Sequence, residues 1–292
     1  MNIQMTAPKL SPLTAEQFMR VNDLYYELSK CDVAEKNFKD LKRRFPDWET
    51  MAEDLDLFVS EGLIERYDRR YRFCIPTILS SELSKLNNET TQLKGACDQL
   101  SEGTILKLLL SLDEQRSNLY FISDKKLASD FKLAQVSAET YTFVDLTRDD
   151  EVVGLASYFV TQNYEHSPEK EVRSLIGDVD HDFFLIFAER TYKQSLEKKP
   201  FKETIFSKIL ALFNYVKIEP LTGLISAMVN VSHYDERLFK STLNNVIEAL
   251  FEQPNQMDIQ SEIRYLLFRN ELLSTLEKKT YIIATRNEEP HD

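Results

Sequence analysis

The stretch that decides the N-terminal fold is DVAEKNFKDLKRRFPDWETMAEDLDLFVSEGLIERYDRRYRF, residues 32–73. Its pattern predicts a short helix over residues 34–44, a turn at residues 46–47, and a second helix over residues 49–60. Gly62 follows that helix, in the position where glycine commonly ends one. The stretch therefore predicts two consecutive short helices joined by a tight turn.

A β-hairpin is expected directly after these helices, with strands over residues 63–67 and 71–75. A further helix over residues 15–29, which Thr14 can cap, precedes them. Helix, turn, helix and hairpin in this order are typical of a winged-helix domain. We place that domain at residues 1–85.

The second helix of the winged-helix stretch is rich in carboxylates. Its apolar residues recur at helical spacing and are expected in the core, which leaves for solvent Glu49, Thr50, Glu53, Asp54, Asp56 and Glu61. In a DNA-reading winged helix this helix enters the major groove, where phosphates repel carboxylates. The pattern therefore favours a non-enzymatic interaction or assembly module that binds a protein partner, still unidentified.

Basic residues in the first helix and the hairpin support an alternative, a DNA-binding transcriptional regulator. The candidates for phosphate contact are Lys39, Arg43, Arg66, Arg69, Arg70 and Arg72. The same residues can instead pair with the carboxylates of the second helix on a solvated surface. The net charge of the 292-residue chain is −12, and none of its three segments is basic, so a large nonspecific nucleic-acid footprint is not expected.

The rest of the chain predicts a mainly α fold with a small α/β element. Residues 86–150 are expected to hold a linker helix and a short βαβ unit, with strands over residues 118–123 and 140–146 and a helix between them over residues 127–136. Residues 151–292 are expected to form an antiparallel helical array, including a helix at 221–231, with a short strand at 281–284.

An acidic cluster after the second of these strands suggests a third possibility, a metal-dependent enzyme. Asp145, Asp149 and Glu151 could hold magnesium there, since α/β proteins often place metal-binding carboxylates at the end of a strand. A charged turn that caps the next helix explains the same residues. No phosphate-binding or zinc motif occurs, and no cofactor is expected.

The stretch GDVDHDFFLIFAE, residues 177–189, repeats the acidic spacing of a calcium loop, with Glu189 twelve positions into a loop begun at Asp178. The sixth position of that loop requires glycine, and here it is Phe183. We therefore expect Asp180 to cap a helix that begins at residue 181.

Two blocks of the sequence resemble a known family. FPDWETMAEDLDLFVSEGLIERYDRRYRFCIPTILSSEL, residues 45–83, and SLIGDVDHDFFLIFAERTYK, residues 174–193, are similar to an uncharacterised family, a domain of unknown function, from streptococci and other lactic-acid bacteria. The resemblance covers about residues 15–220 and implies a bacterial cytoplasmic protein. Cysteine use agrees with that location, because Cys31, Cys74 and Cys97 form no C-x-x-C pair. No apolar run is long enough for a membrane helix, so no membrane partner is expected.

Overall fold

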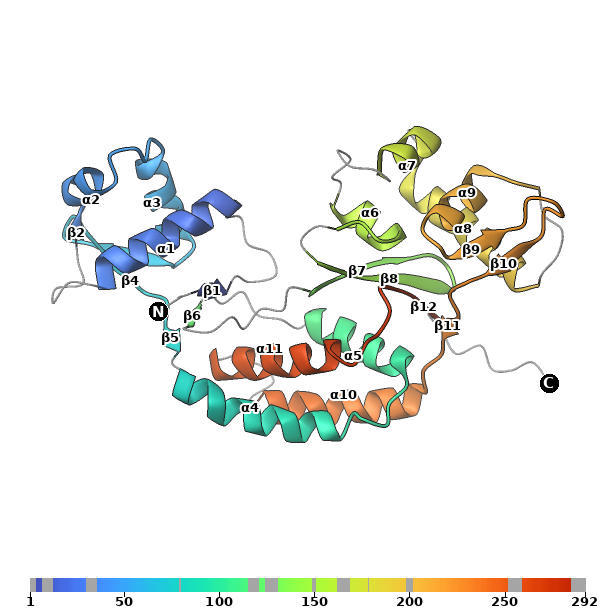
Figure 1. Ribbon diagram of the computed structural model, residues 1–292. Coiled ribbons are helices and arrows are strands. Elements are labelled where there is room, and N and C mark those ends of the chain that lie inside the picture. Colours follow the sequence, from blue (N-terminus) through green and yellow to red (C-terminus); the bar gives the residue numbers. More distant parts are fainter. Residues whose placement is uncertain are drawn as a thin grey trace. The chain divides into compact units, whose positions relative to one another are not determined.

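The computed structural model describes residues 4–6, 13–29, 36–78, 80–114, 121–123, 131–148, 151–161, 169–177, 179–197, 202–251 and 259–284. The chain is mainly helical with several small sheets (Figure 1). It divides into two compact units that alternate along the sequence, where we expected three consecutive domains. Unit 1 comprises Met1–Gln92, Gln115–Ala128 and Leu250–Phe268, and unit 2 comprises Leu93–Glu114, Ser129–Ala249 and Arg269–Asp292.

The N-terminal part of unit 1 contains the helices and the hairpin that the sequence predicts, in the predicted order. The helix predicted over residues 34–44 begins only at residue 38, because residues 36–37 form a strand, β2, that pairs with the hairpin and gives an antiparallel sheet of order β2-β4-β3. The elements are α1 (Ala15–Ser29), β2 (Lys36–Asn37), α2 (Phe38–Arg44), α3 (Met51–Ser60), β3 (Ile64–Tyr67) and β4 (Arg70–Phe73).

Local sequence signals explain where these elements begin and end. Thr14 and Gln17 exchange hydrogen bonds at the start of α1, where the Thr14 hydroxyl accepts from the Gln17 amide at 3.2 Å and the Gln17 side chain accepts from the Thr14 amide at 2.9 Å. Gly62 has a φ of 71° after α3, and the Leu63 amide donates to the Phe58 carbonyl at 2.9 Å. The predicted cap of α1 and the predicted end of α3 are therefore confirmed.

Asp54 corrects one prediction, because it is buried and does not face solvent. Its carboxylate accepts hydrogen bonds from Trp48 Nε1 at 2.6 Å, Thr50 Oγ1 at 2.6 Å and Gln17 Nε2 at 2.8 Å. Helical geometry accounts for the error, since residue 54 lies on the stripe that Met51 begins. Burial alone would raise the pKa of Asp54, but the hydrogen bonds from Thr50, Trp48 and Gln17 outweigh burial and hold that pKa below its ordinary value.

The rest of unit 1 includes a second small sheet and parts of two longer helices. The sheet has the order β1-β6-β5, from β1 (Gln4–Thr6), β5 (Thr77–Ile78) and β6 (Phe121–Ser123). The helices are α4 (Ser80–Gly95) and α11 (Ile259–Leu273), which an ion pair at 3.1 Å between Arg264 and Glu89 joins.

Unit 2 is built on a four-stranded sheet of order β11-β12-β8-β7. Its strands are β7 (Phe131–Ser137), β8 (Tyr141–Arg148), β11 (Val231–Ser232) and β12 (Thr280–Ala284). β8 is antiparallel to both of its neighbours, and β12 confirms the predicted terminal strand. Figure 1 shows helices α6 to α9 on one side of this sheet and α5 on the other.

The predicted βαβ unit is wrong, because residues 131–137 form a strand and not the end of a helix. β7 and β8 are consecutive antiparallel strands joined by a tight turn, in which the Ala138 amide donates to the Tyr141 carbonyl at 2.9 Å. Residues 134–137 alternate between buried and exposed positions, which suits a strand, and pairing with β8 decides between the helical and the strand pattern. Residues 124–130 lie outside the described part of the chain.

The C-terminal region contains more β-structure than the helical array with one terminal strand that we expected. The predicted helix at residues 221–231 is instead a β-hairpin and the strand β11, because Pro220 and Gly223, with a φ of 67°, support a turn there. The remaining elements of unit 2 are α5 (Glu102–Glu114), α6 (Leu155–Thr161), α7 (Glu169–Ile176), α8 (His181–Leu196), α9 (Ile205–Leu212), β9 (Val216–Ile218), β10 (Ile225–Ala227) and α10 (Glu236–Leu250).

We predict that Asp54→Asn destabilises unit 1 by about 2 kcal/mol. An amide has one acceptor oxygen and cannot accept all three hydrogen bonds, and the bonds that remain are no longer strengthened by the charge of a carboxylate. Chemical denaturation followed by the fluorescence of Trp48, the chain's single tryptophan, measures the change in this unit. Asp56→Asn is the control: Asp56 lies on the same helix and is exposed, and a loss of less than about 0.5 kcal/mol is expected. Equal losses in the two variants would contradict the role given to Asp54.

Candidate functional site

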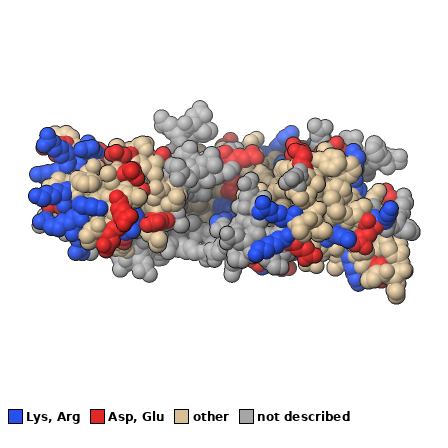
Figure 2. Space-filling view, turned by 90° about the horizontal axis from the view of Figure 1, so that it is seen from above, with Lys and Arg blue, Asp and Glu red and all other residues tan. Residues whose placement is uncertain are grey.

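The predicted phosphate-contacting residues of unit 1 lie on two elements that the sheet brings together. β2 pairs with β4, placing Asn37 opposite Arg70, and β2 runs directly into α2. Figure 2 shows lysine and arginine side chains gathered at the left end of the molecule, the end that α2 and β2 occupy in Figure 1. We call this surface the basic end and define it as Lys39, Arg43, Arg69, Arg70 and Arg72.

Arg66, the remaining candidate, lies on the other face of the hairpin. Arg66 pairs in register with Tyr71, whose side chain is buried, and its guanidinium carbon lies 5.7 Å from the centre of the Tyr71 ring. Arg70 and Arg72 alternate with Tyr71 along β4 and are exposed on the opposite face. Arg66 therefore lies on the opposite face of the hairpin from Arg70 and Arg72.

Acidic side chains neutralise part of the charge at the basic end. Arg43 pairs with Asp40 at 2.7 Å, and Arg72 pairs with Glu65 on the neighbouring strand. The hydrogen bond from Arg72 also holds the pKa of Glu65 below its ordinary value. Asp40 and Glu65 lie outside α3, so these pairs are not the expected ones with the carboxylates of that helix.

Arg69 occupies an unusual backbone conformation at the tip of the hairpin. Asp68 and Arg69 form the two-residue turn between β3 and β4, with φ values of 45° and 62°. A left-handed conformation costs a residue with a side chain on the order of 1 kcal/mol relative to glycine. Strain of this kind often marks a functional position, and here it keeps an arginine at an exposed tip.

A pocket of about 370 Å³ lies between the start of α1 and the outer side of α3, on the helix that would face a DNA groove. We call it the acidic pocket, and it is lined by Thr14, Glu16, Gln17, Thr50, Glu53, Asp54 and Leu57. Glu16 and Glu53 are exposed, and Glu16 pairs with Arg20 at 3.5 Å, whereas the Asp54 carboxylate is buried and accepts the three hydrogen bonds described above. Met19, with 62% of its surface exposed, follows Glu16 on α1. The surface combines negative charge with exposed apolar area.

In unit 2, Asp145 is fully buried and holds the start of α6. One carboxylate oxygen accepts from the Ser157 amide at 2.7 Å and the Ser157 hydroxyl at 2.9 Å, and the other accepts from the Tyr215 hydroxyl at 3.0 Å. Gly154 is required beside them, because an added Cβ would lie 2.3 Å from the carboxylate. Burial raises the pKa of Asp145 to about 6, although these hydrogen bonds oppose the shift.

Glu151, another member of the predicted metal site, does not share this position with Asp145. Glu151 is exposed and pairs with Lys279, whose Nζ lies 2.8 Å and 3.1 Å from its two carboxylate oxygens. Asp149 lies outside the described residues. Within the described part of the chain, no three His, Cys, Asp or Glu side chains come close enough together to hold a metal ion.

The calcium-like spacing at residues 177–189 corresponds to a helix start followed by a structural carboxylate. The Asp180 side chain accepts from the Phe183 amide at 3.0 Å, which confirms the predicted cap of α8. Glu189 is buried and accepts from the amides of Thr140 and Tyr141 at 2.8 Å and 3.1 Å. Its carboxylate thus holds the β7–β8 turn, while Asp178 lies outside the described residues.

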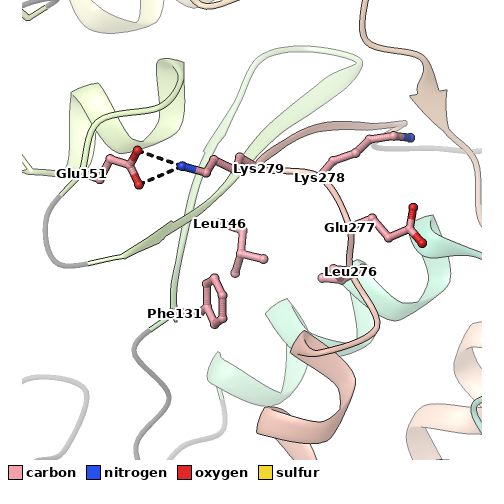
Figure 3. A pocket seen from close by; sticks show the side chains of 7 residues that line it. All are labelled: Phe131, Leu146, Glu151, Leu276, Glu277, Lys278 and Lys279. Atoms are coloured by element: carbon pink, nitrogen blue, oxygen red, sulfur yellow. Dashed lines mark hydrogen bonds and ion pairs between the residues drawn. The ribbon is translucent and has the colours of Figure 1, made fainter.

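A second pocket, of about 260 Å³, lies in unit 2 beside the Glu151–Lys279 pair (Figure 3). It is lined by Phe131, Leu146, Glu151, Leu276, Glu277, Lys278 and Lys279. Lys279 lies 128 residues from Glu151 in the sequence. Sequence reasoning missed this site because no spacing rule relates a residue before α6 to one before β12, and only the pairing of β12 with β8 brings them together.

Comparison with known proteins gives one match, to part of the chain. Residues 8–104 match the model of a family described as a domain of unknown function (DUF1803). The match supports the resemblance of the N-terminal block to an uncharacterised domain family and ends at the start of α5, short of the block at residues 174–193. No curated protein and no solved structure matches the chain. Among the helices described, none has the length and apolar character needed to span a membrane.

We predict that Asp145→Asn is tolerated and removes a pH dependence from unit 2. The pKa of Asp145 is higher in the folded state, about 6, than in an unfolded chain, about 3.9, so the folded state holds an extra proton between these values. Stability of the native protein should therefore fall by about 3 kcal/mol, relative to the variant, as the pH rises from about 4 to about 7.

The asparagine keeps a carbonyl for Ser157 and can donate its amide to the Tyr215 hydroxyl. Asp145→Ala lacks both groups and should cost about 3 kcal/mol or more at any pH. Thermal denaturation followed by circular dichroism across this pH range measures both effects. Parallel stability profiles for the native protein and Asp145→Asn would show that Asp145 is not the titrating group.

Proposed function

We propose that the N-terminal part of unit 1 is a winged-helix module that binds protein, and that the chain serves assembly or regulation. The observation that supports this most strongly is the acidic pocket on α1 and α3. In a DNA-reading winged helix the equivalent of α3 enters the major groove. Here Glu53 and Asp56 are exposed on α3, and bringing carboxylates against phosphates costs several kcal/mol when the charges are not compensated.

The acidic pocket fits a basic side chain of a protein partner. A lysine or arginine could place its charge between Glu16 and Glu53 and lay its aliphatic stem against Leu57, which is partly exposed. The exposed Met19 adds a flexible apolar contact of the kind found at adaptable binding surfaces. These features favour a basic peptide segment as the ligand of this face.

A second candidate function is DNA binding through the basic end. The gathering of lysine and arginine side chains over α2 and the hairpin in Figure 2 favours it, as does the strained Arg69 at the hairpin tip. Phosphate contacts from a hairpin and a neighbouring helix would position the module without base readout by α3. The ion pairs of Arg43 and Arg72 weigh against this candidate, because a phosphate must displace Asp40 and Glu65.

Site-specific cross-linking tests the protein-binding proposal. With a photo-crosslinking residue in place of Met19, the full chain should cross-link to a protein in the producing cells after nuclease digestion. Glu53→Lys, which reverses a charge lining the pocket, should abolish the adduct, since the partner's basic side chain would be repelled. Asp56→Lys makes the same change on the same helix outside the pocket and should leave the adduct intact. Loss of the adduct in both variants, or in neither, would contradict the proposal.

A gel shift with mixed genomic fragments at low salt tests the DNA candidate. On the protein-binding proposal the full chain shows no tight complex, and a double Arg69→Ala, Arg70→Ala variant behaves identically. If DNA is the ligand, the double variant should bind all sequences more weakly, and the slope of log affinity against log salt should fall by about one for each lost phosphate contact. Tight binding that the double variant loses would establish the second candidate in place of the first.

A further inference from the structure

The pocket beside the Glu151–Lys279 pair has an apolar floor and a charged mouth. Figure 3 shows Phe131, Leu146 and Leu276 pointing toward a common space, with the paired side chains of Glu151 and Lys279 extending toward each other at one side of it. Glu277 and Lys278 belong to the lining, but their side chains extend away from that space. The charges that a ligand in the pocket would meet are therefore one carboxylate and one ammonium group.

Hydrogen bonds hold the walls of this pocket in place. The Lys279 carbonyl accepts from the Leu146 amide at 2.7 Å, and the Lys278 amide donates to the Tyr281 hydroxyl at 2.8 Å. On the opposite wall, Arg269 donates to the Phe131 carbonyl at 3.3 Å. The lining is thus built on β7, β8 and the segment that leads into β12, and a ligand would not have to order it.

The ion pair at the mouth can be exchanged for contacts to a ligand. The side chains of Lys279 and Glu151 are 63% and 46% exposed, and an exposed pair of this kind contributes little to stability. A ligand that carried only a negative charge would bring it against Glu151, and one that carried only a positive charge would bring it against Lys279. A ligand with both charges can replace one ion pair with two.

We propose that this pocket binds a free α-amino acid with an aliphatic side chain. The ligand's carboxylate accepts from Lys279, its ammonium group donates to Glu151, and its side chain contacts Phe131, Leu146 and Leu276. The volume of about 260 Å³ lies just below the roughly 300–1,000 Å³ of most small-ligand pockets, which suits an amino acid such as leucine and is small for a nucleotide. The site lies in unit 2 and is independent of the module proposed for unit 1.

Isothermal titration calorimetry of the full chain with L-leucine tests the site. Weak, saturable binding in the millimolar range or tighter is expected for so small a ligand. Leucinamide lacks the carboxylate and N-acetylleucine lacks the ammonium group, so each should bind at least about tenfold more weakly, while glycine should show no binding. Absence of binding at tens of millimolar leucine, or binding of either blocked analogue as tightly as leucine, would overturn the proposal.

Variants with a matched control locate the binding. Glu151→Gln and Lys279→Met should each weaken leucine binding by about tenfold or more, because each removes one charged contact. Glu277→Gln and Lys278→Met make the same changes on neighbouring side chains that extend away from the space, and their affinity should stay within about twofold of the native value. Thermal denaturation without ligand checks that all four fold. Equal losses in the two pairs of folded variants would place leucine elsewhere.

Discussion

A buried carboxylate must have its hydrogen bonds satisfied, and three such groups hold together elements that are distant in the sequence. Asp54 joins α1, the turn before α3 and α3 itself, because its donors are Gln17, Trp48 and Thr50. Asp145 joins β8 to α6 and Tyr215, and Glu189 joins α8 to the β7–β8 turn. An ionised group left without donors in the interior costs several kcal/mol, so each network stabilises one arrangement of its elements against the alternatives.

The same requirement separates structural acids from those available to a ligand. Asp145 and Glu189 belong to spacings that suggest metal binding, yet their oxygens already accept hydrogen bonds from amides and hydroxyls of the chain. Glu16, Glu53 and Glu151 are exposed and line pockets. Glu16 pairs with Arg20 and Glu151 with Lys279, but these pairs are exposed and a partner can exchange them for its own contacts. Two properties decide which carboxylates of this chain are candidates for binding a ligand: whether the side chain is exposed, and whether its oxygens already accept hydrogen bonds within the protein interior.

The charge on unit 1 is arranged in two surfaces of opposite sign. Carboxylates line the α1–α3 face, and arginines and lysines gather over α2 and the hairpin. β2 makes this arrangement possible, because its pairing with β4 fixes the start of α2 beside the hairpin strand that carries Arg70 and Arg72. The two surfaces suit different ligands. Both carry exposed ion pairs, Arg43–Asp40 and Arg72–Glu65 at the basic end and Arg20–Glu16 beside the acidic pocket, and the carboxylates exposed on α3 leave the acidic face as the better supported site.

The sequence by itself determined the helices of the N-terminal region, the end of α3 at Gly62, the β3–β4 hairpin and the cap of α8 at Asp180. These features are predictable because helix caps, glycine turns and short-range periodicity depend on residues only a few positions apart. Only the tertiary structure decided that residues 131–137 form a strand, since pairing with β8 supplies the hydrogen bonds that overrule a helical pattern. It also decided that Asp54 is buried and that Lys279 meets Glu151, because both contacts depend on which surfaces pack together and no local signal encodes that choice.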